Sequence, residues 1–325
     1  LAAGNAVVVK PAEVTPLMAL ELAKICEEAG VPKGMISVLP GKGSVIGDAI
    51  TKHPPVKRVS FTGGTTAGKH SAHIAADKMM PVSLELGGKS ATMVLEDADL
   101  DHAVNGVLYG IFSSSGESCI AGSRLFVARG IYDAFVARLA DAAKNLRVGN
   151  PESERTQMGP LITAKHRESI ERYVALGVSE GGSIRTGGVR PQGGEFDKGY
   201  FYTPTILEGL GNQARITQEE IFGPVLVAMP FDSEEELIAQ ANDSLYALAA
   251  GVWSRDFKRA WALGRAVQAG TVWVNTYKQF SVSTPFGGWR DSGLGREKGR
   301  EGIFQYMEQK SMYWGTNEQP IAWAD

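Results

Sequence analysis

The first 87 residues alternate short apolar runs with segments of helical periodicity, and this alternation limits the possible folds more than any other feature. The run at 6–10 is β-branched and does not alternate, as in a strand buried on both faces, and the run at 82–86 is also predicted to be a strand. Between them, an apolar stripe over 18–29 has helical spacing and stops at Gly30. The pattern predicts an α/β fold with a doubly wound parallel sheet.

Glycine and polar residues follow the predicted strands. In parallel sheets, ligands bind outside the carboxyl ends of the strands. The residues at those ends are Lys10, Glu13, Gly41, Gly43 and the segments 62–65 and 85–88. Glycine N–H groups at the start of a helix bind phosphate well. The sequence therefore predicts a nucleotide or dinucleotide crevice along this edge.

Composition restricts the class of protein. A length of 325 residues allows two domains, and a net charge of −3 argues against a nucleic-acid or anionic-membrane surface. No run of about 18 apolar residues predicts a membrane span. The two cysteines are expected to be free thiols in a reducing, cytoplasmic compartment, and the five scattered histidines predict no metal site. The start at Leu1 is interpreted as lying inside a larger protein.

Cys119 lies in a loop of small residues, 113–124, between a predicted helix and a predicted strand at 125–127. Such a loop can present a side chain to a ligand. A thiol there acts as a nucleophile when its pKa is tuned. The loop alone leaves two alternatives open: a half-buried structural cysteine, and a Cys–His hydrolase whose histidine approaches only in the fold.

A second nucleotide motif overlaps the first crevice. Residues 63–69 read GGTTAGK, which fits the P-loop spacing after a strand. His70 occupies the position of the magnesium-binding Ser or Thr, so a P-loop NTPase is kept only as a weaker alternative.

Seven motifs occur together in the order found in the aldehyde dehydrogenase superfamily, and the chain resembles the last two-thirds of that family. They are VKPAE (9–13), FTGGT (61–65), LELGGK (84–89), GESCIAGSR (116–124), EEIFGP (219–224), GTVWVN (270–275) and PFGG (285–288). The resemblance implies a cofactor-binding domain at 1–87, a catalytic domain at 88–302, and a return segment with an oligomerisation tail at 303–325.

The resemblance implies that Cys119 attacks an aldehyde to give a thiohemiacetal. A hydride then passes to the nicotinamide of NAD(P)+, and water activated by Glu85 hydrolyses the thioester to a carboxylic acid. Glu308 matches a second glutamate that relays the proton. The presence of Glu85 favours hydrolysis over transfer to coenzyme A.

The resemblance also implies the cofactor residues. Lys10 and Glu13 would hold the adenosine ribose, and a carboxylate there favours NAD over NADP, although NADP stays possible. The remaining predicted contacts are Gly43, Thr62, Gly63, Gly64, Leu86, Glu220 and Phe222. Gly64 departs from the family, which usually has a serine at this position.

On the substrate side, the resemblance indicates a pocket lined by Ser118, Ile120, Gln279 and Phe280 and a neutral aldehyde as the small-molecule partner. The tail at 311–325 is similar to a strand that pairs with a neighbouring subunit, which predicts a homodimer or homotetramer. An asparagine that helps to bind the oxyanion is expected upstream of Leu1. A catalytically impaired or non-enzymatic relative is therefore the alternative function.

Overall fold

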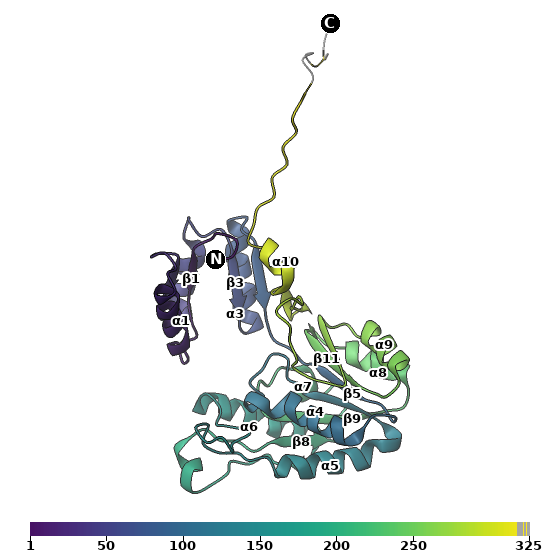
Figure 1. The fold of residues 1–325 in the computed structure, drawn as a ribbon. Helices are drawn as coiled ribbons and strands as arrows, with labels where there is room; N and C mark the ends of the chain where they lie inside the picture. The colour runs from purple at the N-terminus through teal and green to yellow at the C-terminus, as the bar shows by residue number, and fades with distance from the viewer. Residues whose placement is uncertain (317–320, 322, 324–325) are drawn as a thin grey trace.

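The computed structural model describes residues 1–316, 321 and 323 and has two lobes. Figure 1 shows the smaller lobe, with α1 (Leu17–Glu28) and α3 (Thr65–Asp77), above the larger lobe, with α4 (Leu100–Phe112) and α5 (Tyr132–Lys144). The predicted α/β class is therefore confirmed.

The smaller lobe contains two sheets. β1 (Val7–Val9) pairs in parallel with β2 (Ile36–Val38), and β3 (Val59–Thr62) pairs in parallel with β4 (Val82–Glu85). The connections are helical, as the alternation predicts, and include α1, α3, η1 (Gly43–Gly47) and α2 (Asp48–Lys52). A late strand, β14 (Gly293–Leu294), adds to β4 in antiparallel orientation. The chain therefore returns to the β3–β4 sheet of the smaller lobe before residue 303, and the domain boundary at 302 stays a prediction.

The larger lobe is a seven-stranded sheet in the order β12-β11-β5-β6-β9-β8-β7. Its strands are β5 (Ala91–Val94), β6 (Arg124–Ala128), β7 (Ser183–Thr186), β8 (Thr205–Glu208), β9 (Val225–Phe231), β11 (Ala249–Trp253) and β12 (Thr271–Val274). Every neighbouring pair is parallel except β7 with β8. This topology needs crossover helices between strands.

Helices cover both faces of this sheet. Apolar residues of α4 and α5 pack on one face, together with Leu125, Val127 and Trp253. On the other face lie α6 (Ala164–Ser179), α7 (Arg215–Gln218), α8 (Glu234–Asn242) and α9 (Phe257–Ala266). The core of this lobe is thus two apolar layers separated by the sheet, a doubly wound arrangement. The sequence pattern predicted such a sheet for residues 1–87, where the strands form two separate sheets.

Two glycine-rich segments contain short regular elements. The glycine-rich stretch 181–199 holds the edge strand β7 and the turn of helix η4 (Gly194–Lys198), and the run 285–302 holds β13 (Trp289–Arg290), β14 and the start of α10 (Gly299–Phe304). β7 has one buried residue of four, and β13 and β14 have two residues each. Elements this short or this exposed show no hydrophobic period, so the sequence could not reveal them.

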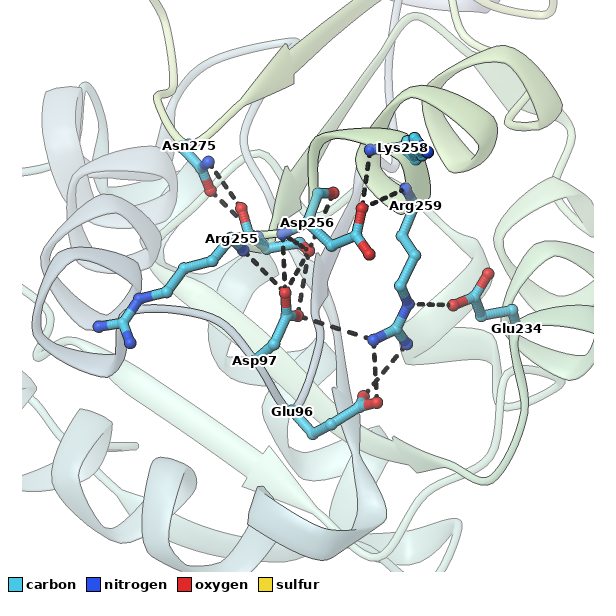
Figure 2. A network of polar contacts seen from close by, with 9 residues as sticks. Glu96, Asp97, Glu234, Arg255, Asp256, Lys258, Arg259 and Asn275 are labelled. Atoms are coloured by element: carbon cyan, nitrogen blue, oxygen red, sulfur yellow. Dashed lines mark hydrogen bonds and ion pairs between the residues drawn. The ribbon is translucent and has the colours of Figure 1, made fainter.

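A polar network ties together the carboxyl ends of β5, β11 and β12 (Figure 2). The Asp97 carboxylate accepts hydrogen bonds from the N–H groups of Arg255 and Asp256, at 2.9 and 2.8 Å, and from the Ser254 hydroxyl at 2.8 Å. The Asn275 side chain binds the N–H and the carbonyl of Ser254. These bonds fix the direction in which the chain leaves β12.

The C-terminal part of the described chain extends beyond α10. After α10, Gln305 accepts a hydrogen bond from Arg58 and the Tyr306 carbonyl accepts one from Asn5, so both residues still contact the smaller lobe. The following residues lead away from both lobes (Figure 1) and contain no strand up to residue 316. The rest of the predicted pairing strand, at 317–320, 322, 324 and 325, lies outside the described residues. Among the described helices, none has the length and apolar character needed to cross a membrane.

Gly106 in α4 provides a test of the core packing. A Cβ at this position would lie 2.0 Å from the indole of Trp253, which is 2% exposed and cannot move aside. We expect Gly106→Ala to lower the free energy of unfolding, measured in urea, by about 2 kcal/mol, because overpacking outweighs the helix preference for alanine. The matched control is Gly264→Ala in α9, where the nearest atom is 3.6 Å away. It should raise the same free energy by up to about 1 kcal/mol, and equal stabilities of the two variants would contradict this account.

Candidate active site

The loop that carries Cys119 has an unusual backbone. Ser114 and Ser115 both have a φ of 55°, and Gly116 follows with a φ of 71°, so the chain turns sharply after α4. A Cβ on Gly116 would lie 2.2 Å from the backbone of Gly223. The turn therefore needs glycine both for its conformation and for its packing. It presents Cys119 just before the amino end of β6.

Cys119 is held from two sides. The Tyr277 hydroxyl donates a hydrogen bond to the carbonyl of Ile120 at 3.0 Å, and a Cβ on Gly88 would lie 2.1 Å from the carbonyl oxygen of Cys119. The second contact presses the segment after β4 against the cysteine loop. Because Glu85 is the last residue of β4, this contact brings the predicted base to the predicted nucleophile.

Two carboxylates act on the thiol. Burial raises the pKa of Cys119 to about 11, and the nearby charges of Glu220 and Glu85 raise it further in the same direction. Glu220 is anchored by the N–H of Gly88, which donates to its Oε1 at 2.9 Å. The structure thus groups three residues that the sequence singled out separately. Without ligands, the thiol is uncharged at neutral pH.

Glu85 is a buried carboxyl group without a hydrogen-bond partner. It is 8% exposed, and among the described residues neither of its side-chain oxygens has a partner. Burial and the negative charge of Glu297 raise the pKa of Glu85 to about 7, and Arg296 and Lys298 oppose this shift. A carboxyl group with a pKa near neutrality can take up and release protons, as a general base must.

Glu297 is a site residue that the sequence did not reveal. Its carboxylate accepts a hydrogen bond from the Ser60 hydroxyl at 3.0 Å and acts on Glu85 electrostatically. The predicted relay residue, Glu308, is exposed beyond α10, and no described contact joins it to Glu85. The relay role of Glu308 therefore stays a prediction, while the carboxylate that influences Glu85 is Glu297.

The residues predicted to bind the pyrophosphate and nicotinamide lie beside Glu85. Thr62 is its register partner on β3, and the N–H of Gly63 donates to the carbonyl of Glu85 at 3.1 Å. Gly64 caps α3 without a side-chain hydrogen bond, so the first N–H groups of the helix are available to a phosphate. Leu86 is buried and packs against Gly68 of α3.

The two predicted ribose-binding residues, Lys10 and Glu13, gather with the predicted cofactor residue Gly43 at the carboxyl ends of β1 and β2. Glu13 Oε1 accepts a hydrogen bond from the N–H of Gly43 at 2.8 Å, and the Lys10 ammonium donates to the Pro11 carbonyl. A carboxylate and an ammonium side by side fit the hydroxyls of a ribose. No described contact joins them to Cys119.

Phe222 is 40% exposed and has a φ of 57°. Its ring meets that of His166 edge to face, and His166 Nε2 lies 2.7 Å from the Phe222 carbonyl. His166 Nε2 also lies 3.5 Å from Glu117 Oε1. No sequence motif predicts that His166 lies beside Phe222, because His166 belongs to α6 and is far along the chain from Cys119.

The P-loop interpretation finds no support in the side chains. Lys69 forms an ion pair with Asp291 at 2.9 Å, and His70 forms one with Asp48 at 2.8 Å. Both side chains are therefore engaged in ion pairs within the protein. Among the described residues, no group of three His, Cys, Asp or Glu side chains could hold a metal ion.

The predicted substrate residues surround an aromatic cluster next to Cys119. Ile120 is buried and Ser118 half-buried, and the carbonyl of Gln279 accepts a hydrogen bond from the Trp273 indole at 2.7 Å. Phe280 meets Trp273 edge to face. Between Tyr277 and Gln279 lies Lys278, which the sequence interpretation did not consider. Lys278 is half-buried and places a charge beside these residues, and the neutral aldehyde stays a prediction.

Comparison with known proteins supports the resemblance. The family model described as "Aldehyde dehydrogenase family" matches residues 1–312. The chain is 43% identical over 323 residues to a betaine aldehyde dehydrogenase of Bacillus subtilis (strain 168), which covers 99% of this chain and 66% of that protein. A betaine aldehyde dehydrogenase of Mesorhizobium japonicum is also 43% identical, over 98% of this chain and 65% of that protein.

Solved structures agree. The betaine aldehyde dehydrogenase of Staphylococcus aureus, a point mutant in complex with NAD+, superposes with a TM-score of 0.96 at 40% identity, covering 98% of this chain and 65% of that one. An NAD+ complex of an aldehyde dehydrogenase from Bacillus cereus gives a TM-score of 0.93 at 43% identity, and the match covers 96% of this chain and 63% of that one. The chain spans about two thirds of the length of these relatives. It belongs to the aldehyde dehydrogenase family.

Proposed function

We propose that this protein oxidises an aldehyde to a carboxylic acid with NAD+, with Cys119 as the nucleophile and Glu85 as the base. The observation that carries the proposal is the buried Glu85 carboxyl, which lacks a described hydrogen-bond partner and acts electrostatically on the Cys119 thiol. The relatives' names, which include betaine aldehyde dehydrogenases, support the same reaction type.

The first step requires a thiolate. Because burial raises the pKa of Cys119 to about 11, the thiol needs a base, and Glu85, with a pKa of about 7, can accept its proton. The thiolate then adds to the aldehyde carbon, and the backbone N–H of Cys119 stabilises the oxyanion. Bound NAD+ accepts the hydride. Glu85 passes the first proton to solvent and then takes a proton from the water that attacks the thioester. The acid is released, and Glu85 returns this proton to the leaving thiolate, which regenerates the thiol.

The donor and acceptor groups present fit NAD. Lys10 and Glu13 would hold the adenosine ribose, and the free N–H groups at the start of α3 would hold the pyrophosphate. Glu220 and Phe222 would contact the nicotinamide ribose and ring. The carboxylate of Glu13 would repel a 2′-phosphate, which favours NAD over NADP.

We further propose a homodimer or homotetramer in the cytoplasm. Both Cys26 and Cys119 are free thiols, as suits a reducing compartment. The competing function is a catalytically impaired relative that keeps the fold and binds NAD without turnover.

The roles of Cys119 and Glu85 are tested by NADH formation over a panel of aldehydes. We expect Cys119→Ser to abolish turnover, whereas Ser118→Ala, one residue away, should retain it. Glu85→Gln should give a slowed burst of one NADH per site and a steady-state rate lower by about 100-fold or more, because general-base catalysis of thioester hydrolysis is lost. Turnover that survives in Cys119→Ser would contradict the proposal. An inert wild type that still binds NAD would favour the impaired relative.

The pH dependence of kcat tests the environment of Glu85. Because Glu85 works as a base and its pKa is about 7, the rate should fall as the pH drops through about 7. Glu297→Gln removes a charge that raises this pKa, so the acid limb should move to lower pH by up to about one unit. Glu308→Gln is the matched control and should leave the limb in place. A shift in Glu308→Gln, with none in Glu297→Gln, would assign the second carboxylate to Glu308.

A further inference from the structure

Lys278 places an ammonium group without a carboxylate partner beside the nucleophile. The side chain is half-buried, and its Nζ donates a hydrogen bond of 2.7 Å to the hydroxyl of Ser113. Within residues 1–316, no Asp or Glu forms an ion pair with Lys278, and the titratable group that acts on it is Cys119. A half-buried cation normally has an anionic partner, so this one is available to a ligand.

The backbone of Lys278 is strained in this position. Lys278 has a φ of 55°, a left-handed conformation that a lysine rarely adopts. On one side, Asn275, with a φ of 51°, is fixed by its two hydrogen bonds to Ser254. Next to Lys278, Tyr277 is fully buried and bonds to the carbonyl of Ile120. Strained residues held by their surroundings concentrate at functional sites.

Aromatic rings and a second cation line the same side of the pocket. The Lys278 ammonium lies 6.0 Å from the centroid of the Tyr109 ring. The Lys298 ammonium lies 4.0 Å from the Phe280 ring and 5.5 Å from the Phe286 ring, and it also has no ion pair with a described residue. Apolar walls with a few placed charges are typical of sites that bind a small molecule in one orientation.

The thiol does not neutralise Lys278 in the resting protein. Burial lowers the pKa of Lys278 to about 8 and raises that of Cys119 to about 11. At neutral pH the lysine is therefore mostly a cation and the thiol is uncharged. The carboxylates of Glu85 and Glu220 act on Cys119, but no described hydrogen bond joins either of them to Lys278. The missing negative charge must come from a ligand.

We propose that Lys278 binds an anionic group of the substrate, so that the enzyme oxidises aldehydes that carry a carboxylate a few carbons from the carbonyl. This inference rests on the proposed function and gives it a substrate class. The Lys278 ammonium and the Cys119 thiol act on each other electrostatically, so an anion bound at Lys278 would lie a short chain away from the reacting carbon. Ser113 completes the anion site, because its hydroxyl can donate to the second carboxylate oxygen.

The same charge excludes the substrate named in the relatives. Betaine aldehyde carries a quaternary ammonium group, and an unpaired ammonium in the pocket wall repels it. Lys278 therefore selects a substrate whose charge is opposite to that of betaine aldehyde.

The kinetic test compares three aldehydes: 4-oxobutanoate, butanal and betaine aldehyde. We expect the wild type to prefer 4-oxobutanoate over butanal in kcat/KM. Lys278→Met should lower kcat/KM for 4-oxobutanoate by about 10- to 100-fold, mainly through KM, and change the value for butanal by less than about 2-fold. Lys278→Arg, which keeps the charge, is the matched control and should retain the preference. Equal losses for both aldehydes in Lys278→Met would overturn the proposal and indicate a role in activating the thiol.

A chemical probe tests the anion site without turnover. Iodoacetate and iodoacetamide alkylate the same thiol, and they differ in charge. In a Cys26→Ser background, the ratio of the Cys119 alkylation rates, iodoacetate over iodoacetamide, should exceed that of a free thiol. Lys278→Met should lower this ratio about 10-fold, and Lys278→Arg should preserve it. An unchanged ratio in Lys278→Met would overturn the proposal.

The two tests separate failure of the substrate class from failure of the reaction. Turnover of butanal without any preference for 4-oxobutanoate would refute the role of Lys278 and leave the dehydrogenase reaction intact. An alkylation ratio that depends on Lys278 in a protein with no NADH formation would support the anion site and refute the proposed reaction.

Discussion

The absence of side chains at Gly87 and Gly88 lets the segment after β4 pack against Glu220 and the cysteine loop, and the site depends on this packing. A side chain on Gly87 would lie 2.3 Å from Glu220, and one on Gly88 would lie 2.1 Å from the Cys119 carbonyl oxygen. Because both positions lack a Cβ, the strand that ends at Glu85 can pass directly against the loop that precedes β6. The carboxyl end of one sheet thus meets the amino end of the other, and the base and the nucleophile come from different lobes.

Burial at this junction sets the chemical state of both groups. It raises the pKa of Glu85 to about 7 and that of Cys119 to about 11, so the carboxyl group is the easier of the two to ionise. The resting thiol is therefore uncharged, which limits its oxidation, since oxidants react mainly with the thiolate. The nucleophile becomes reactive only when Glu85 removes its proton.

The sequence predicts those parts of the site that depend on local pattern. Strand ends marked by glycine, at Glu85 and at Gly63, and the small-residue loop at Cys119 are visible without a structure. The sequence alone does not show whether Glu297 or Glu308 lies near Glu85. This depends on β14, a two-residue strand that pairs with β4 and carries the following residues toward Glu85. A strand of two residues has no period to detect.

Lys278 was missed for a related physical reason. Its direction is set by left-handed backbone at Asn275 and by a tyrosine hydroxyl bond to Ile120, and neither follows from hydrophobic spacing. The same anchoring explains how the pocket can vary while the chemistry is preserved. The segment after β12 is fixed by the Ser254 backbone and by Ile120, whereas the Gly88 N–H fixes Glu220 and strand β4 fixes Glu85. A change of charge at Lys278 therefore alters what binds next to the thiol without moving the residues that react.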